Sequence, residues 1–187
     1  GAAWRLGYLF AVKWDQSVGV NDAIYYSIQA GLNSEGQWFE DGLSGLPGAE
    51  HGPLTALYLT PWSIGSWGAP QQRLAMTVVG IATVALIGLV ARRLVVVGRD
   101  DVALADRAGL IAAAIAAVYP NLWLNDSVVM SEALAILLTA AGLLVAVRNQ
   151  HRLSTRAAIG VGVLGGLACL ARSELALLVA GWALVAV

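Results

Sequence analysis

The chain has little charge. Only 12% of its 187 residues are Asp, Glu, Lys or Arg, whereas 58% are hydrophobic. In a soluble domain about a quarter of the residues are usually charged, because its surface is in contact with water. The deficit argues against a soluble protein and favours one embedded in a lipid bilayer. The net charge of -1, with no basic patch of interleaved aromatic residues, gives no case for nucleic acid as a partner.

Cysteine and the motifs of soluble enzymes are also scarce. The single Cys169 lies in an apolar run, so the sequence has neither a disulfide framework nor a cysteine metal cluster. There is no P-loop, GxSxG, HExxH or GxGxxG motif. Any chemistry must therefore come from the polar residues between the apolar runs.

Basic residues are missing from one long stretch. No Lys or Arg occurs between Lys13 and Arg73, although six acidic residues do. Short cytoplasmic loops of membrane proteins collect Lys and Arg, so residues 15–72 are predicted to form a long extracytoplasmic loop. Seven of the 11 basic residues fall in 92–107 and 148–156, which are predicted to be cytoplasmic. This pattern indicates a multi-pass membrane protein with its long loop outside.

Apolar runs predict the membrane helices. Residues 1–14 read as the end of a first helix. The runs at 74–91 and 108–125 have 18 uncharged residues each, close to the roughly 20 needed to span a bilayer. Shorter runs follow within 133–147, 157–171 and from 175 onward. The expected fold is all-α, a polytopic transmembrane helix bundle. Residues 73–187 supply four to five further helices, and the module 1–187 is expected to be a fragment of a larger protein. A soluble bundle stays open as the alternative for such short helices.

The predicted loop carries its own periodicity. Ile24, Ile28 and Leu32 recur at helical spacing, which predicts an amphipathic helix from Asp22 to Leu32 lying on the membrane surface and packed through these side chains. Short amphipathic surface helices are therefore expected within the extracytoplasmic loop. Asp22 is also a good N-cap for such a helix, so a purely structural role is open.

Polar residues flank the predicted helices and are expected to meet at one outer face. They are Asn21, Asp22, Glu50, His51, Asn125, Asp126, Ser131, Glu132, Arg172 and Glu174. Polar groups at membrane depth are expensive and usually serve a site or satisfy one another. For Glu132, the alternative is a favourable interaction with the helix macrodipole. For Arg172 and Glu174, it is an interfacial position.

The order of several segments resembles the N-terminal part of the polytopic GT-C glycosyltransferases, the superfamily of protein mannosyltransferases and aminoarabinose transferases. The segments are DAIYY at 22–26, EHGPL at 50–54, AGLIAA at 108–113, YPNLW at 119–123, Asp126 with Ser131 and Glu132, and LARSE at 170–174. Together they extend over nearly the whole chain. Its richness in Ala, Gly, Val and Arg resembles members from actinobacteria.

The resemblance implies an inverting transferase that moves a sugar from a polyprenyl-phosphate donor to the hydroxyl group of an unidentified acceptor at the outer side of the bilayer. Asp22 matches the general base. His51 matches a position near the donor phosphate, for which Arg172 is a second available cation. Glu50 matches a position that holds a divalent metal in some members, and Gly52 replaces a proline. The residues expected to support the site are Asp126, Glu132 and Glu174.

Two other classes stay open. One is a multi-pass transporter or flippase for a lipid or small solute, with the acidic loop as a gate. The other is a non-catalytic membrane scaffold. A transporter is expected to place ionisable residues near mid-bilayer between broken helices. The sequence instead places the acids at predicted helix ends and in the loop, which favours the transferase.

Overall fold

The computed structural model describes residues 1–19, 22–40, 45, 46, 48, 51–65, 68–150 and 154–186. The elements of this part are all helices, which confirms the predicted all-α class. Two helices are long and apolar enough to cross a membrane, α4 (Ala69–Arg99) and α7 (Ser131–Arg148). A third span results if α5 (Val102–Val118) and α6 (Pro120–Asp126) count as one broken helix. The described chain thus has the character of a membrane protein with two or three spans.

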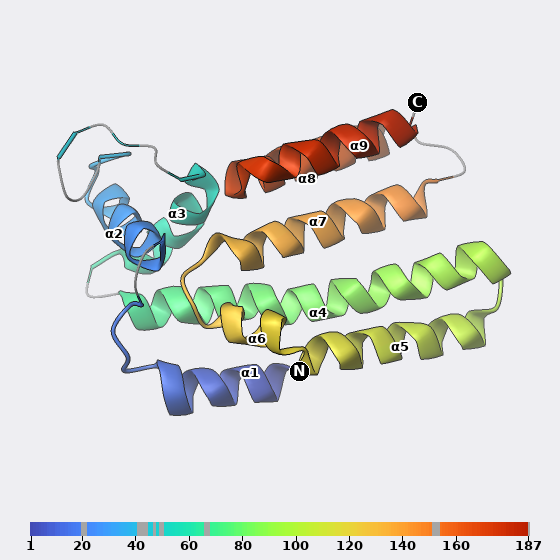
Figure 1. Cartoon of the computed structure of the whole chain (residues 1–187), viewed down its shortest axis with the longest axis horizontal. Helices are drawn as coiled ribbons and strands as arrows, with labels where there is room; N and C mark the ends of the chain where they lie inside the picture. The colour runs from blue at the N-terminus through green and yellow to red at the C-terminus, as the bar shows by residue number, and fades with distance from the viewer. Residues whose placement is uncertain are drawn as a thin grey trace.

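The remaining elements are shorter. They are α1 (Ala2–Tyr8), η1 (Leu9–Lys13), α2 (Asp22–Ser34), α3 (Pro53–Leu59), η2 (Thr60–Ser63), α8 (Thr155–Ala171), η3 (Ser173–Leu175) and α9 (Ala176–Ala186). The long helices run side by side, and α2 and α3 gather at one end of them (Figure 1). The α4–α5 turn and the C-terminal end of α7 lie at the opposite end. Arg99 and Arg148 therefore lie at the end of the bundle opposite to α2 and α3.

The prediction of a loop at 92–107 is wrong. α4 continues to Arg99 and α5 begins at Val102. Arginine is a good helix former, and its long side chain reaches water from a helix end, so the basic residues do not stop the helix. Asp100 ends α4 in the left-handed conformation with φ 51°, and the Asp101 side chain caps α5. The turn between the two helices is short and acidic.

The prediction of a single helix at 108–125 is also wrong, because the structure has a break at Pro120. α5 ends at Val118, α6 starts at Pro120, and the two axes differ by 60°. Proline has no N–H to donate and its ring clashes with the preceding turn. The break turns α6 back against α4 and brings its C-terminal end toward α7.

α2 confirms the helix predicted from Asp22, and its isoleucines lie on the side away from the protein. Ile24 and Ile28 are 41% and 39% exposed. The buried side is formed by Ala23, Tyr26, Gln29, Ala30 and Asn33. That Ile24, Ile28 and Leu32 pack the helix on a membrane surface stays a prediction.

Polar partners explain this choice of side. Ser27 Oγ donates to Gln72 Oε1 at 2.6 Å, and Gln72 Nε2 donates to Ser63 Oγ at 2.8 Å. Asn33 Nδ2 donates to Thr60 Oγ1 at 3.4 Å. Amides that find partners at a buried interface avoid the penalty of an unmade hydrogen bond, so α2 turns its polar side inward.

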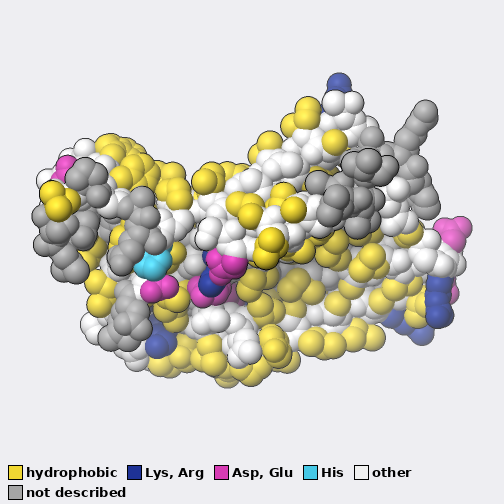
Figure 2. Space-filling model, turned by 45° about the horizontal axis from the view of Figure 1, so that its top comes forward, with side chains coloured by type: hydrophobic (Ala, Val, Ile, Leu, Met, Phe, Trp, Pro, Cys, Tyr) yellow, Lys and Arg dark blue, Asp and Glu magenta, His cyan; other side chains and the backbone are white. Residues whose placement is uncertain are grey.

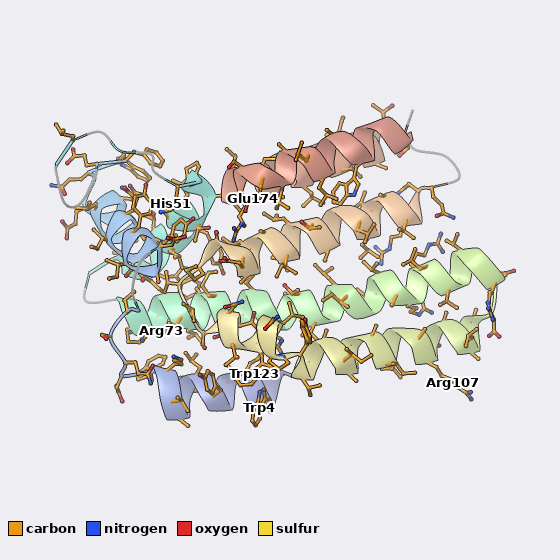
Figure 3. The ribbon with its side chains drawn as sticks, viewed as in Figure 1. Trp4, His51, Arg73, Arg107, Trp123 and Glu174 are labelled. Carbon is orange, nitrogen blue, oxygen red and sulfur yellow. The ribbon has the colours of Figure 1, made fainter. Side chains whose placement is uncertain are left out.

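The first segment, 1–14, is helical from Ala2 to Lys13, as α1 followed by η1. Arg73, near the start of α4, is 4% exposed. Its guanidinium donates to the carbonyl oxygens of Lys13, Gln16 and Ser17 at 2.6–2.7 Å. These bonds attach the segment that follows the first helix to α4 (Figure 3).

Candidate functional site

A carboxylate and an imidazole meet at the α2–α3 end. Asp22 is the first residue of α2, and His51 lies just before α3. His51 Nε2 is 3.8 Å from Asp22 Oδ1, with side chains 29% and 45% exposed. The distance is too long for a hydrogen bond, so the two form an ion pair only when the imidazole is protonated. Both side chains remain accessible to a ligand.

Two tyrosines hold the imidazole. The ring centroid of His51 lies 4.7 Å from that of Tyr25, at 72° between the planes, and 5.5 Å from that of Tyr26. Edge-to-face ring contacts at such distances are favourable. The segment DAIYY thus supplies the carboxylate and both rings from two successive turns of one helix.

Gly52 places His51 against the end of α8. A Cβ atom at position 52 would lie 2.5 Å from the carbonyl oxygen of Leu170 and 2.8 Å from that of Ala171. No side chain fits this approach. The glycine that replaces a proline of the resembling family therefore has a physical reason. The contact brings the α3 segment to the part of the chain that carries Arg172.

Arg172 joins two carboxylates. Its Nη1 donates to Glu132 Oε1 at 2.5 Å, and its Nε donates to Glu174 Oε1 at 2.6 Å. Burial acts to lower the pKa of Arg172, but the hydrogen bonds and charges of Glu174 and Glu132 outweigh it and raise that pKa. A hydrogen bond to its own backbone amide, together with that from Arg172, lowers the pKa of Glu174. One arginine and two glutamates give this group a formal net charge of -1.

Tyr26 lies between these two groups. It is 2% exposed, and burial raises the pKa of its phenol, with the negative charges of Asp22 and Glu132 adding to the effect. A hydrogen bond with Ser131 and the positive charge of Arg172 act in the opposite direction. The phenol is protonated at neutral pH and links α2 to the start of α7.

The two groups share one face of the molecule. Figure 2 shows a histidine beside acidic side chains and, close by, a mixed acidic and basic group. Figure 3 places His51 and Glu174 at the same end of the bundle, where α3 approaches α8. We refer to Asp22, Tyr26, His51, Ser131, Glu132, Arg172 and Glu174 as the junction site.

The junction site offers an accessible carboxylate and an arginine that is already paired. Asp22 is an accessible carboxylate with an imidazole beside it, the composition of a general base and its partner. Arg172 is 34% exposed but already engaged by two carboxylates. Glu174 is the more exposed of these, at 58%. A phosphate reaching Arg172 would therefore displace Glu174 first.

The structure brings together five of the seven predicted site residues: Asp22, His51, Glu132, Arg172 and Glu174. Asp126 lies elsewhere, 5% exposed and paired with Arg5 of α1. Glu50 lies outside the described residues. Among the residues that the structure describes, no group of three or more His, Cys, Asp or Glu side chains is arranged to hold a metal ion.

Sequence reasoning missed Tyr26 and Arg5. Tyr26 could have been found, because it is four residues after Asp22 and therefore lies on the same helix face. Arg5 could also have been found. An arginine inside an apolar run is energetically unfavourable unless it has a polar partner. The sequence did not indicate which acid would be that partner.

No family model, curated protein or solved structure matches the chain. The functional conclusion therefore depends on the chemistry of the junction site and on the segment resemblance.

Gly52→Ala is expected to lower the free energy of unfolding by about 1–3 kcal/mol, as overpacking does, because the added Cβ meets backbone rather than a side chain that can move. Thermal melts in one detergent measure the change. The control is Gly31→Ala in α2, where a Cβ meets nothing within 4 Å and helix propensity favours Ala. Equal melting temperatures for the two variants would contradict the close contact with α8.

Proposed function

We propose that the protein is a membrane glycosyltransferase that moves a sugar from a polyprenyl-phosphate donor to an acceptor hydroxyl group, with inversion at the anomeric carbon. The observation that supports it best is the junction site itself. There the accessible Asp22 lies 3.8 Å from His51, across Tyr26 from Arg172, at one end of membrane-length helices. A lipid-linked donor requires a site at such a boundary.

The proposed step uses Asp22 as the general base. Its carboxylate takes the proton of the acceptor hydroxyl group while the acceptor oxygen forms a bond to the anomeric carbon. The bond from that carbon to the phosphate oxygen breaks, and the polyprenyl phosphate leaves with the electron pair. An alcohol is a poor nucleophile, so a positioned base is needed at this point.

Two cationic side chains are proposed to stabilise the leaving phosphate, whose negative charge grows in the transition state. They are Arg172 and the protonated form of His51. Arg172 reaches the phosphate by exchanging its exposed partner Glu174, while its bond to Glu132 keeps the guanidinium in place. Glu50, with a divalent metal ion as cofactor, remains a ligand proposed from the resemblance alone.

The proposal includes a location: a multi-pass protein of the plasma membrane with residues 15–72 and the junction site on the extracytoplasmic side. In a Cys169→Ala background, Glu35→Cys should react with a membrane-impermeant maleimide on intact cells. Arg107→Cys, exposed near the opposite end (Figure 3), should react only after permeabilisation. The positive-inside rule predicts this order, and the reverse order would invert the topology.

A transporter or flippase is the second candidate, and one observation favours it. The α5–α6 span is broken by 60°, and beside it Arg5 and Asp126 form a buried ion pair. Discontinuous helices with buried ionisable residues are typical of transport pathways. The sequence alone had placed the acids at helix ends, which disfavoured this class.

Reconstitution separates the two candidates. The purified chain in liposomes is given a polyprenyl-phosphate sugar and an alcohol acceptor. Release of free polyprenyl phosphate with a new glycoside supports the transferase. Movement of the intact lipid between leaflets, with no bond cleaved, supports the flippase and contradicts our proposal.

A further inference from the structure

The break between α5 and α6 leaves two backbone carbonyls without helical partners. In a continuous helix the carbonyl of Ala116 accepts from the amide of residue 120, but Pro120 has no N–H. The carbonyl of Ala117 would accept from residue 121, which lies beyond the 60° bend. Unsatisfied carbonyls inside a membrane are costly, so these two need a donor from another element.

Arg5 of α1 is that donor. Its Nη1 donates to the carbonyl oxygen of Ala117 at 2.8 Å, and its Nη2 donates to that of Ala116 at 3.2 Å. The third side of the guanidinium, Nε, donates to Asp126 Oδ2. Arg5 is 2% exposed and Asp126 5%. One planar cation thus contacts the end of α5 and the end of α6 together.

The acidic ligand is held from α4. The Thr77 hydroxyl donates to the backbone carbonyl of Asp126 at 3.3 Å. Gly80 leaves the space that the Asp126 carboxyl group fills, since a Cβ there would overlap it. Trp4 and Tyr8, on either side of Arg5, contact Trp123 of α6 edge-on at 5.4 Å and 5.0 Å. Thr77 and Gly80 thus place Asp126 against α4, where Arg5 binds its carboxylate.

We propose that the carbonyl oxygens of Ala116 and Ala117 and the carboxylate of Asp126 form a monovalent cation site, which the protein fills with its own guanidinium. Two carbonyls at a helix end and one carboxylate are the kind of ligand set by which broken membrane helices hold small cations. A single acidic ligand matches one positive charge.

An ion pair alone does not account for the geometry. A carboxylate partner would engage only part of the guanidinium, whereas here both terminal nitrogens face carbonyls that the helix break exposes. Through Arg5, α1 occupies the cation site at the α5–α6 break. A free ion can enter only if Arg5 is removed, so the site acts as a structural anchor in the intact protein.

Chemical rescue tests the site. Arg5→Ala in the whole chain should lower the melting temperature in detergent by about 10 °C, because it leaves a buried carboxylate unpaired. Millimolar methylguanidinium chloride should restore part of this loss. Tetramethylammonium chloride, which has no N–H to donate, should restore none. The wild type and the exposed-site control Arg107→Ala should not respond to either salt.

Failure of methylguanidinium to raise the melting temperature of folded Arg5→Ala overturns the proposal. If Arg5→Ala does not accumulate as folded protein, the double variant Arg5→Ala, Asp126→Ala decides. Removal of the unpaired charge should let it fold and melt higher than any recovered single variant, without response to methylguanidinium. A double variant that is no more stable, or that still responds to the salt, contradicts a site built on Asp126.

Discussion

Asp22→Asn is expected to abolish sugar transfer almost completely while the protein keeps its fold. A general base contributes about 10²–10⁴-fold to a rate, and an amide has no comparable basicity. Asparagine matches aspartate in size and is an equally good residue at a helix start. The structural loss is limited to the interaction of one charge with the helix dipole, about 0.3–1 kcal/mol. The effect on turnover should therefore far exceed the effect on stability.

Two measurements on three variants make that result decisive. Sugar transfer from a polyprenyl-phosphate donor is followed in liposomes, beside a thermal melt of each variant. Glu35→Gln is the matched control, because Glu35 is an exposed acid just beyond the other end of α2 and should retain full activity. Asp22→Ala should lose activity and about 1 kcal/mol of stability as well. Wild-type turnover by Asp22→Asn would end the catalytic assignment and leave Asp22 as a helix-start residue.

Most of the polar residues that lie close together could be identified from the sequence, because this required only the positions of the helix ends. Asp22 opens α2, Glu132 opens α7, and Arg172 and Glu174 follow α8. The apolar runs and the distribution of basic residues place these ends together. Which side chains pair within the site could not be predicted from the sequence. Gly52 determines how closely α3 approaches α8, and nothing local in the sequence reveals such a contact.

The interior could not be predicted from periodicity. In α2 the isoleucines repeat at helical spacing, yet they are exposed, and the side that faces the protein carries Ser27 and Asn33, which donate to Gln72 and Thr60. The break at Pro120 was not predicted, and nothing local indicated that Arg5, more than a hundred residues away, would satisfy the freed carbonyls. In both places long-range polar partners outweigh the local apolar pattern, because an unmade buried hydrogen bond costs more than an exposed methyl group.

Gly80→Ala is expected to be the most destabilising single methyl addition in α4. The atoms that a Cβ would meet are the carboxyl carbon and both carboxyl oxygens of Asp126. That group cannot swing away, because Arg5 binds its side chain and Thr77 binds its backbone carbonyl. The methyl group therefore has to separate α6 from α4 or break the buried ion pair. Breaking such a pair costs about 3–5 kcal/mol.

Gly98→Ala provides the comparison within the same helix. A Cβ at position 98 meets nothing within 4 Å, and alanine is favoured over glycine in a helix by about 1 kcal/mol. The two variants should therefore shift the melting temperature in opposite directions in the same detergent. A Gly80→Ala protein that melts like the wild type would mean that α6 does not press on α4 at this point. The ion pair would then have room to move, as a transport pathway requires, and the flippase would become the better candidate.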